Sequence, residues 1–223
     1  MSNTTLIIGS SGSGKSTSLR NLNHETTFIL NTLDKPLPFR GYKSKYKAIS
    51  GWDDKEGNYY ASDDYVRIMR AIRMVSDSRP EITTLVLDDF NYIMCNEFMR
   101  RSGERGFDKY SEMASHVHSI VQELNSTRPD LFCFILSHND ADSQGFMRLK
   151  TIGKLLSEKV EIEGMVTTVF HSMVVDGEFK FLTQLTSSHL AKSPLGMFAE
   201  KLIDNDLLPI VAAMVDYYNE DGE

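Results

Sequence analysis

Residues 4–17 read Thr-Thr-Leu-Ile-Ile-Gly-Ser-Ser-Gly-Ser-Gly-Lys-Ser-Thr, and this stretch decides the fold class. Its first five residues are β-branched or apolar, which predicts a short buried strand. Four residues then separate Gly9 from Gly14-Lys15-Ser16, which is the Walker A spacing, and residues 15–22 have a spacing that predicts a helix. Because the pattern lies between a strand and a helix, we prefer a phosphate-binding loop to an ordinary glycine-rich turn.

The glycine-rich loop offers the groups that a nucleoside triphosphate with Mg²⁺ needs at its phosphate end. Backbone N–H groups from Ser11 to Lys15 can cradle the β-phosphate, because glycine permits close approach and a helix N-terminus adds positive potential. Lys15 would neutralise the β- and γ-phosphates, and the Ser16 hydroxyl would bind Mg²⁺. We therefore expect ATP and Mg²⁺ as cofactors, and a nucleotide site made of Gly9, Ser10, Ser11, Gly12, Ser13, Gly14, Lys15, Ser16 and Thr17.

Acidic or polar residues follow three other expected strands. Asp88 ends the strand at residues 83–87, where its carboxylate can bind Mg²⁺ directly or through water. Asp89 can polarise the attacking water or act as a solvated N-cap of the next helix, and Asp34 is the alternative base. His138 ends the strand after that helix, where it can sense the γ-phosphate or stand exposed to solvent.

Hydrophobic periodicity along the chain predicts strands that alternate with helices. The segment Ser62-Asp63-Asp64 is the expected N-cap of one helix, and Asp176-Gly177 is a strong type I′ turn signal. The expected strands cover residues 4–8, 27–30, 83–87 and 131–136, and the expected helices cover 15–22, 65–75, 90–99, 107–124, 151–160 and 207–218.

This order predicts an α/β fold with a mostly parallel central sheet flanked by helices and a C-terminal antiparallel hairpin. We expect one domain over residues 1–223. Within it, residues 35–60 form a basic and aromatic excursion, residues 164–185 the hairpin and residues 197–223 a C-terminal helical segment.

The composition indicates a globular protein of a reducing compartment. The chain has 223 residues, 41% of them hydrophobic, and a formal net charge of -7, so any nucleic-acid contact must come from local basic patches. Cys95 and Cys133 fall within apolar runs, as reduced buried thiols do. No apolar run reaches the length of a bilayer and no signal peptide is recognisable, so we expect a cytoplasmic protein without a membrane partner.

Two glycine-containing loops, at residues 100–106 and 139–150, carry basic residues despite the acidic total. Arginine and lysine beside an aromatic ring can hold phosphates and stack a base of single-stranded DNA, although a solvated charged loop is the more common role for each loop alone. The candidate DNA-binding residues are Arg100, Arg101, Arg105, Phe146, Arg148 and Lys150.

The order of elements resembles a RecA-like P-loop ATPase core, in particular the phage Sak-type single-strand annealing ATPases, which are related to RecA and Rad proteins. The Walker motifs at residues 9–17 and 85–89 are generic, and three segments are more discriminating: Leu136-Ser-His138, Arg148-Leu-Lys-Thr-Ile-Gly-Lys-Leu-Leu156 and Ala191-Lys-Ser-Pro-Leu-Gly-Met197.

The resemblance implies that residues 100–106 and 139–150 are DNA-binding loops and that His138 couples the γ-phosphate to the second loop. It makes Lys192 a candidate to reach ATP on an adjacent subunit, which implies a homo-oligomer assembled through the ATP site. The glutamate that usually acts as base after the second strand is absent, and only Asp34 stands near that place.

The leading hypothesis is an ATPase that binds single-stranded DNA and promotes annealing or recombination for a phage, with a single-strand-binding protein as a further candidate partner. A nucleoside or small-molecule kinase is an alternative, in which residues 148–154 imitate a lid. A nucleotide-gated module of a replication complex is another, with residues 35–60 as its partner surface.

Overall fold

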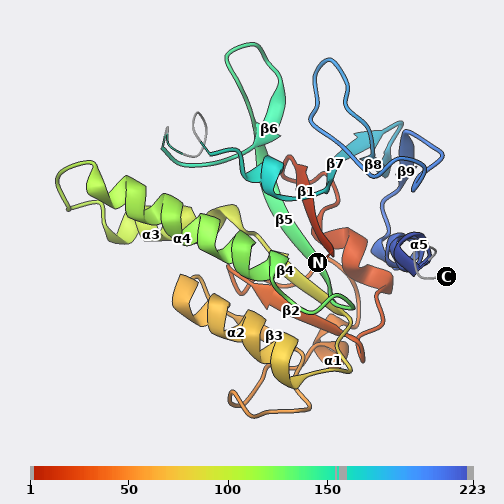
Figure 1. Cartoon of the computed structure of the whole chain (residues 1–223), viewed down its shortest axis with the longest axis horizontal. Helices are drawn as coiled ribbons and strands as arrows, with labels where there is room; N and C mark the ends of the chain where they lie inside the picture. Colours follow the sequence, from red (N-terminus) through yellow and green to blue (C-terminus); the bar gives the residue numbers. More distant parts are fainter. Residues whose placement is uncertain (1–2, 154, 156–159, 220–223) are drawn as a thin grey trace.

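The central sheet of the computed structural model, which describes residues 3–153, 155 and 160–219, has the strand order β3-β2-β4-β5-β1-β7-β8-β9, with β6 paired to β5 alone (Figure 1). The strands are β1 (Asn3–Gly9), β2 (Thr27–Asn31), β3 (Tyr59–Ala61), β4 (Thr84–Asp88), β5 (Phe132–Ala141), β6 (Met147–Leu149), β7 (Thr168–Val175), β8 (Glu178–Leu182) and β9 (Leu202–Asp204).

The sheet is parallel from β3 to β7 and antiparallel beyond it. Asp176 and Gly177 link β7 to β8 with φ angles of 52° and 83°, and a type I′ turn requires positive φ at both positions. The predicted α/β class, with a mostly parallel sheet and a C-terminal antiparallel hairpin, is therefore confirmed.

Helices cover both faces of the sheet because alternate strand residues point to opposite sides. The helices are η1 (Ser16–Asn21, a 3₁₀ helix), α1 (Tyr42–Lys45), α2 (Tyr65–Ser78), α3 (Asn91–Arg100), α4 (Asp108–Asn125), η3 (Ile162–Met165, 3₁₀) and α5 (Leu207–Asn219). Leu6 and Ile8 of β1 pack with α2, α3 and α4, which lie together on one face (Figure 1). Ile7 packs in a second core with η1 and α5.

Three local predictions need correction. The segment expected as a helix at residues 15–22 is the short 3₁₀ helix η1. The polar loop expected at residues 139–150 continues β5 to Ala141 and returns as β6, so it forms a hairpin arm. In the segment expected to be helical from residue 197, Leu202–Asp204 form the strand β9 before the helix α5. The helix predicted at residues 151–160 falls largely on residues 154 and 156–159, which lie outside the described residues.

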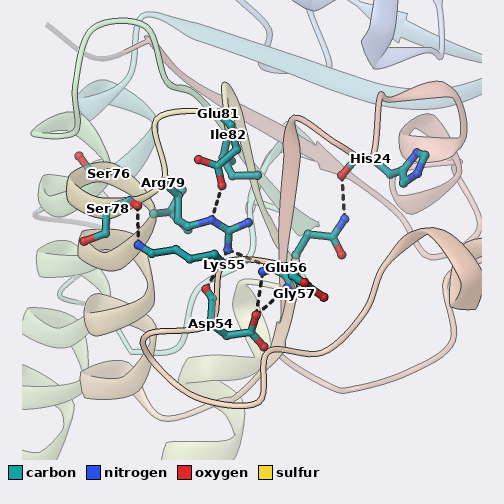
Figure 2. Close-up of polar contacts among 12 residues, drawn as sticks. His24, Asp54, Lys55, Glu56, Gly57, Ser76, Ser78, Arg79, Glu81 and Ile82 are labelled. Carbon is teal, nitrogen blue, oxygen red and sulfur yellow. Dashed lines mark hydrogen bonds and ion pairs between the residues drawn. The ribbon is translucent and has the colours of Figure 1, made fainter.

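The excursion at residues 35–60 is tied to the end of α2 by a buried arginine (Figure 2). Arg79, 2% exposed, donates to the backbone oxygens of Asp54 and Gly57 and forms an ion pair with Glu81. Lys55 donates to the Ser78 oxygen at the end of α2. These contacts hold residues 54–57, which precede β3, against the end of α2.

None of the helices formed by the described residues combines the length and the apolarity that crossing a bilayer demands.

Candidate nucleotide-binding site

The glycine-rich loop leaves β1 at the carboxyl edge of the parallel sheet, between β5 and β7. A Cβ at Gly9 would lie 2.6 Å from the Ser172 backbone oxygen, and one at Gly14 would lie 2.8 Å from the Phe179 ring. Gly14 also has a φ of +97°, which other residues rarely adopt. The loop therefore needs glycine at both positions, and β7 and β8 pack directly against it.

Lys15 folds back over the loop. Its Nζ donates to the carbonyl oxygens of Gly9, at 2.8 Å, and Ser10, at 2.9 Å. Burial lowers the pKa of Lys15 to about 8, against the opposing effect of the Asp88 and Asp89 carboxylates. An ammonium that is desolvated and held only by neutral carbonyls favours a stronger anionic partner.

Ser16 and Asp88 meet across the edge of the sheet, although they are far apart in the sequence. The Ser16 Oγ donates to Oδ1 of Asp88 at 3.0 Å. Asp88 is fully buried, and its burial, followed by the charge of Asp89, raises its pKa to about 6. Within the described part of the chain, its Oδ2 has no hydrogen-bond partner.

These donors fit Mg²⁺. A hard cation prefers carboxylate and hydroxyl oxygens, and it takes one or two protein ligands together with water and phosphate oxygens. The unpartnered Oδ2 of Asp88 and the adjacent Ser16 hydroxyl supply such oxygens at the place where the loop would hold phosphates.

Asp89 turns away from the strand with a φ of +61°, in the left-handed region. Its side chain is 2% exposed, forms an ion pair with Lys35 through Oδ2, and places Oδ1 3.8 Å from Nε2 of His138. The N-cap of α3 is Phe90, with no side-chain cap. The alternative in which Asp89 is a solvated N-cap is therefore wrong.

Asp34, the alternative base, is exposed and has a φ of +52°. Its Oδ1 accepts a hydrogen bond from the Tyr59 hydroxyl at 3.0 Å. The next residue is Lys35, whose ammonium reaches Asp89. Asp34 thus lies in the loop that borders the site, whereas Asp89 lies inside it.

His138 is half-buried, so the interpretation as a histidine exposed to solvent is wrong. Its ring makes an edge contact with Tyr92, with centroids 5.8 Å apart, and its backbone N–H donates to Asn91 Oδ1. Burial, and then the positive charge of Lys15, lower the pKa of His138. A neutral imidazole beside Asp89 can accept or donate a hydrogen bond at neutral pH.

Sequence reasoning missed four contacts of the loop and its surroundings. The Ser10 Oγ donates to Oδ1 of Asn139 at 3.1 Å, and Asn139 Nδ2 lies 3.5 Å from Nε2 of buried His171. These contacts connect the glycine-rich loop to the base of the arm. Phe179 on Gly14 and Lys35 on Asp89 were also missed, because each depends on which strands are neighbours.

The first basic loop is largely engaged in ion pairs within the chain. Arg100 binds Asp63, with 2.6 Å between Nη1 and Oδ2. Arg101 pairs with three glutamates, Glu97, Glu104 and Glu112. Among the described residues, Arg105 has no ion-pair partner.

The arm carries acidic residues together with its basic ones. Arg148 pairs with Glu161 at 3.5 Å, and Phe146 is half-buried. Lys150 is exposed and has no ion-pair partner in the described ranges. Exposed Asp140 and Asp142 offset these two cations, so the arm as a whole is not a basic surface.

Lys192 lies away from the loop in sequence and pairs with β7. Its backbone N–H and oxygen exchange hydrogen bonds of 2.8 Å with Val169, and its side chain is half-buried. Burial lowers its pKa, against the nearby carboxylates of Glu163 and Glu161. In its own chain, Lys192 is therefore associated with these acidic residues near η3.

Comparison of the chain with protein-family models and with curated proteins gave no match.

Proposed function

We propose that this chain binds ATP together with Mg²⁺ and hydrolyses it at the carboxyl edge of β1 and β4. The observation that carries the proposal is the hydrogen bond between Ser16 and Asp88. One residue comes from the Walker A pattern and the other from the acidic strand end, and each was assigned to Mg²⁺ on separate grounds. Their contact supports a shared metal and phosphate site.

Each residue of the site has a role in such binding. The loop N–H groups and the ammonium of Lys15 would hold the phosphates, and Lys15 would leave the Gly9 and Ser10 carbonyls to do so. Ser16 and Asp88 would hold Mg²⁺, which neutralises phosphate charge when bound. The new interactions with phosphate and Mg²⁺ would then offset the free-energy cost of desolvating Lys15 and Asp88.

Hydrolysis needs a group that accepts a proton from the attacking water. The water oxygen forms a bond to the γ-phosphorus, the bond from that phosphorus to the bridging oxygen breaks, and ADP and phosphate leave. We assign Asp89 to accept the proton, because its carboxylate is buried at the edge of the site beside His138. His138 would orient the carboxylate or the water.

The proposed nucleotide site has a direct structural link to the arm. The backbone oxygen of His138 accepts a hydrogen bond of 2.9 Å from the N–H of Lys150, where the arm ends. Asn139, at the start of the arm, contacts Ser10 of the loop. A change at the γ-phosphate can thus shift the arm, which projects beyond the carboxyl edge of the sheet (Figure 1).

We propose single-stranded DNA as the ligand that this link serves. Support comes from Arg105 and Lys150, which lack ion-pair partners among the described residues, and from Phe107, which is 86% exposed and lies two residues after Arg105 in the sequence. Free cations and an exposed ring are what phosphates and stacked bases require. For annealing, we propose that copies of this chain assemble through the ATP site. Lys192 is the candidate to reach the ATP site of the adjacent copy.

The test is steady-state ATP hydrolysis with and without single-stranded DNA. We expect Lys15→Ala to lower turnover at least about 100-fold, because it removes a charge that stabilises the transition state. An Arg105→Ala, Lys150→Ala variant should keep basal turnover and lose stimulation by DNA. The matched control is Lys43→Ala, Lys47→Ala, which removes two exposed charges from the excursion.

Three outcomes would contradict parts of this proposal. Unchanged turnover in Lys15→Ala would reject the nucleotide site. Hydrolysis that DNA does not stimulate would favour a nucleotide-gated module with another partner. Transfer of labelled phosphate from ATP to a nucleoside would favour a kinase.

A further inference from the structure

Lys35 brings a second ammonium group into the candidate nucleotide site. It follows β2, and its Nζ forms an ion pair with Oδ2 of Asp89, the other oxygen of which lies 3.8 Å from His138. Asp89 is 2% exposed, whereas the side chain of Lys35 is 45% exposed. The pair therefore joins a fixed buried anion to a cation that water can reach and that has room to move.

The backbone before Lys35 is held in place. Asn31, fully buried at the end of β2, accepts a hydrogen bond from the Leu33 N–H and donates one to the Lys35 oxygen at 3.0 Å. Asp34 then reverses the chain with a φ of +52°. Asn31 lies opposite Asp88 in the parallel register, so this turn is anchored at the Mg²⁺ edge of the sheet.

The charges around Lys35 balance in the free protein. Lys15 and Lys35 supply two positive charges, and Asp88 and Asp89 supply two negative charges, within one electrostatically connected group. A bound triphosphate adds more negative charge than Asp89 carries. The ammonium of a flexible lysine then has a stronger partner within the same small region.

We propose that Lys35 recognises the γ-phosphate, and that it does so by exchanging its ion pair with Asp89 for one with the nucleotide. This inference rests on the proposed ATP site. In the free protein and with ADP bound, Lys35 keeps its ion pair with Asp89. With ATP bound, Lys35 pairs with the γ-phosphate instead, and the Asp89 carboxylate becomes available to accept a proton from water. The contact distinguishes ATP from ADP and ties the availability of the base to the presence of the γ-phosphate.

The exchange makes Asp89 a competitor of the γ-phosphate. Replacing Asp89 by asparagine removes this competitor, so triphosphate affinity should rise while Lys35 is present. The gain should disappear when Lys35 is also replaced, because the two residues act through one contact. This non-additivity separates the proposed exchange from a general change in charge near the site.

The experiment is calorimetric titration of the protein, in the presence of Mg²⁺, with ADP and separately with a β,γ-imido analogue of ATP that is not hydrolysed. We expect Lys35→Met to weaken binding of the analogue by about tenfold, which corresponds to one charge-assisted hydrogen bond, and to leave ADP within about twofold. Lys35→Arg should keep most of the preference. Lys43→Met, an exposed lysine of the same segment, is the matched control.

The remaining variants guard against a folding defect, since Lys35→Met leaves Asp89 buried without its partner. Asp89→Asn should bind the analogue more tightly than the wild type by about fivefold, and the Lys35→Met, Asp89→Asn double variant should lose that gain. Equal losses for ADP and the analogue, or additive effects in the double variant, would overturn the role of Lys35. Failure of the wild type to bind either nucleotide would instead overturn the ATP site itself.

Discussion

At the scale of single residues, the candidate site contains ionisable groups that are costly to bury. Desolvation is the chief cause of both pKa shifts: it lowers the pKa of Lys15 and raises the pKa of Asp88, so each shift favours the neutral form of the group. Such groups are retained where a ligand relieves the cost, and perturbed pKa values gather at functional sites. His171, two hydrogen-bond steps from the loop, is a third group of this kind.

His171 gives a prediction about stability and pH. It is 2% exposed, and burial, followed by the neighbouring His189, lowers its pKa to about 4 from 6.5. Between these values the unfolded chain binds more protons than the folded one, so stability falls as the pH drops from 6.5 to 4. We expect this residue to account for a loss on the order of 2 kcal/mol in the free energy of unfolding across that window.

Urea unfolding at several pH values measures this effect. His171→Gln should show a weaker loss of stability on acidification than the wild type, and His118→Gln on α4 serves as the control for replacing a histidine elsewhere in the chain. Identical pH dependence in His171→Gln and the wild type would show that His171 is not a buried neutral group.

At the scale of elements, α2 presents the clearest agreement between local sequence and structure. Asp64 precedes the helix in an extended conformation, and its Oδ1 accepts a hydrogen bond from the Arg67 N–H at 3.0 Å. Ile68, Ile72 and Val75 then face the core at helical spacing. The cap begins the helix and the apolar stripe holds it against the sheet.

Removing this cap should destabilise the protein without affecting the site. We expect Asp64→Ala to lower the free energy of unfolding by about 1 kcal/mol, because one N–H in the first turn loses its acceptor. Asp64→Ser should restore most of it. Asp77→Ala, an exposed acid near the other end of α2, serves as control in the same urea titration. A loss as large in Asp77→Ala would attribute the effect to net charge and not to the cap.

The sequence predicted the elements whose signals are local. Apolar runs marked β1, β2 and β4, and Asp176-Gly177 marked the hairpin, because these signals lie within a few residues. The continuation of β5 through Ser137 to Ala141 was missed, since those residues are polar and pair with β6. The contact of Lys35 with Asp89 depends on the adjacency of β2 and β4, which no local pattern encodes.

The same limit applies to the candidate site. Ser16 and Asp88 were each predicted from a motif, and the structure brings them together. The basic loops were judged from their basic residues alone, whereas Arg101 is surrounded by glutamates that sequence distance concealed. Ion pairing is a property of the packed chain, so counts of basic residues overstate the charge available to DNA.

At the scale of the whole molecule, the features that matter lie at one edge of the sheet. This edge brings together the glycine-rich loop and the side chains of Asp88, Asp89, Lys35 and His138. The arm extends from the same edge (Figure 1). Ligands of open parallel sheets bind at the carboxyl ends of the strands. Because the chain has a net charge of -7, the proposed contact with DNA depends on local cations, which the proposal places at Arg105 and Lys150.

The central claim is that the chain binds ATP together with Mg²⁺, and calorimetric titration tests it most directly. ATP is titrated, once with Mg²⁺ and once with a chelator, into the wild type and into Asp88→Asn. Asp53→Asn, at an exposed aspartate, is the control. We predict that Mg²⁺ tightens ATP binding at least about tenfold in the wild type and in Asp53→Asn, and that Asp88→Asn loses this dependence because Mg²⁺ loses its carboxylate. An absence of ATP binding in the wild type, or a full Mg²⁺ dependence in Asp88→Asn, would contradict the account.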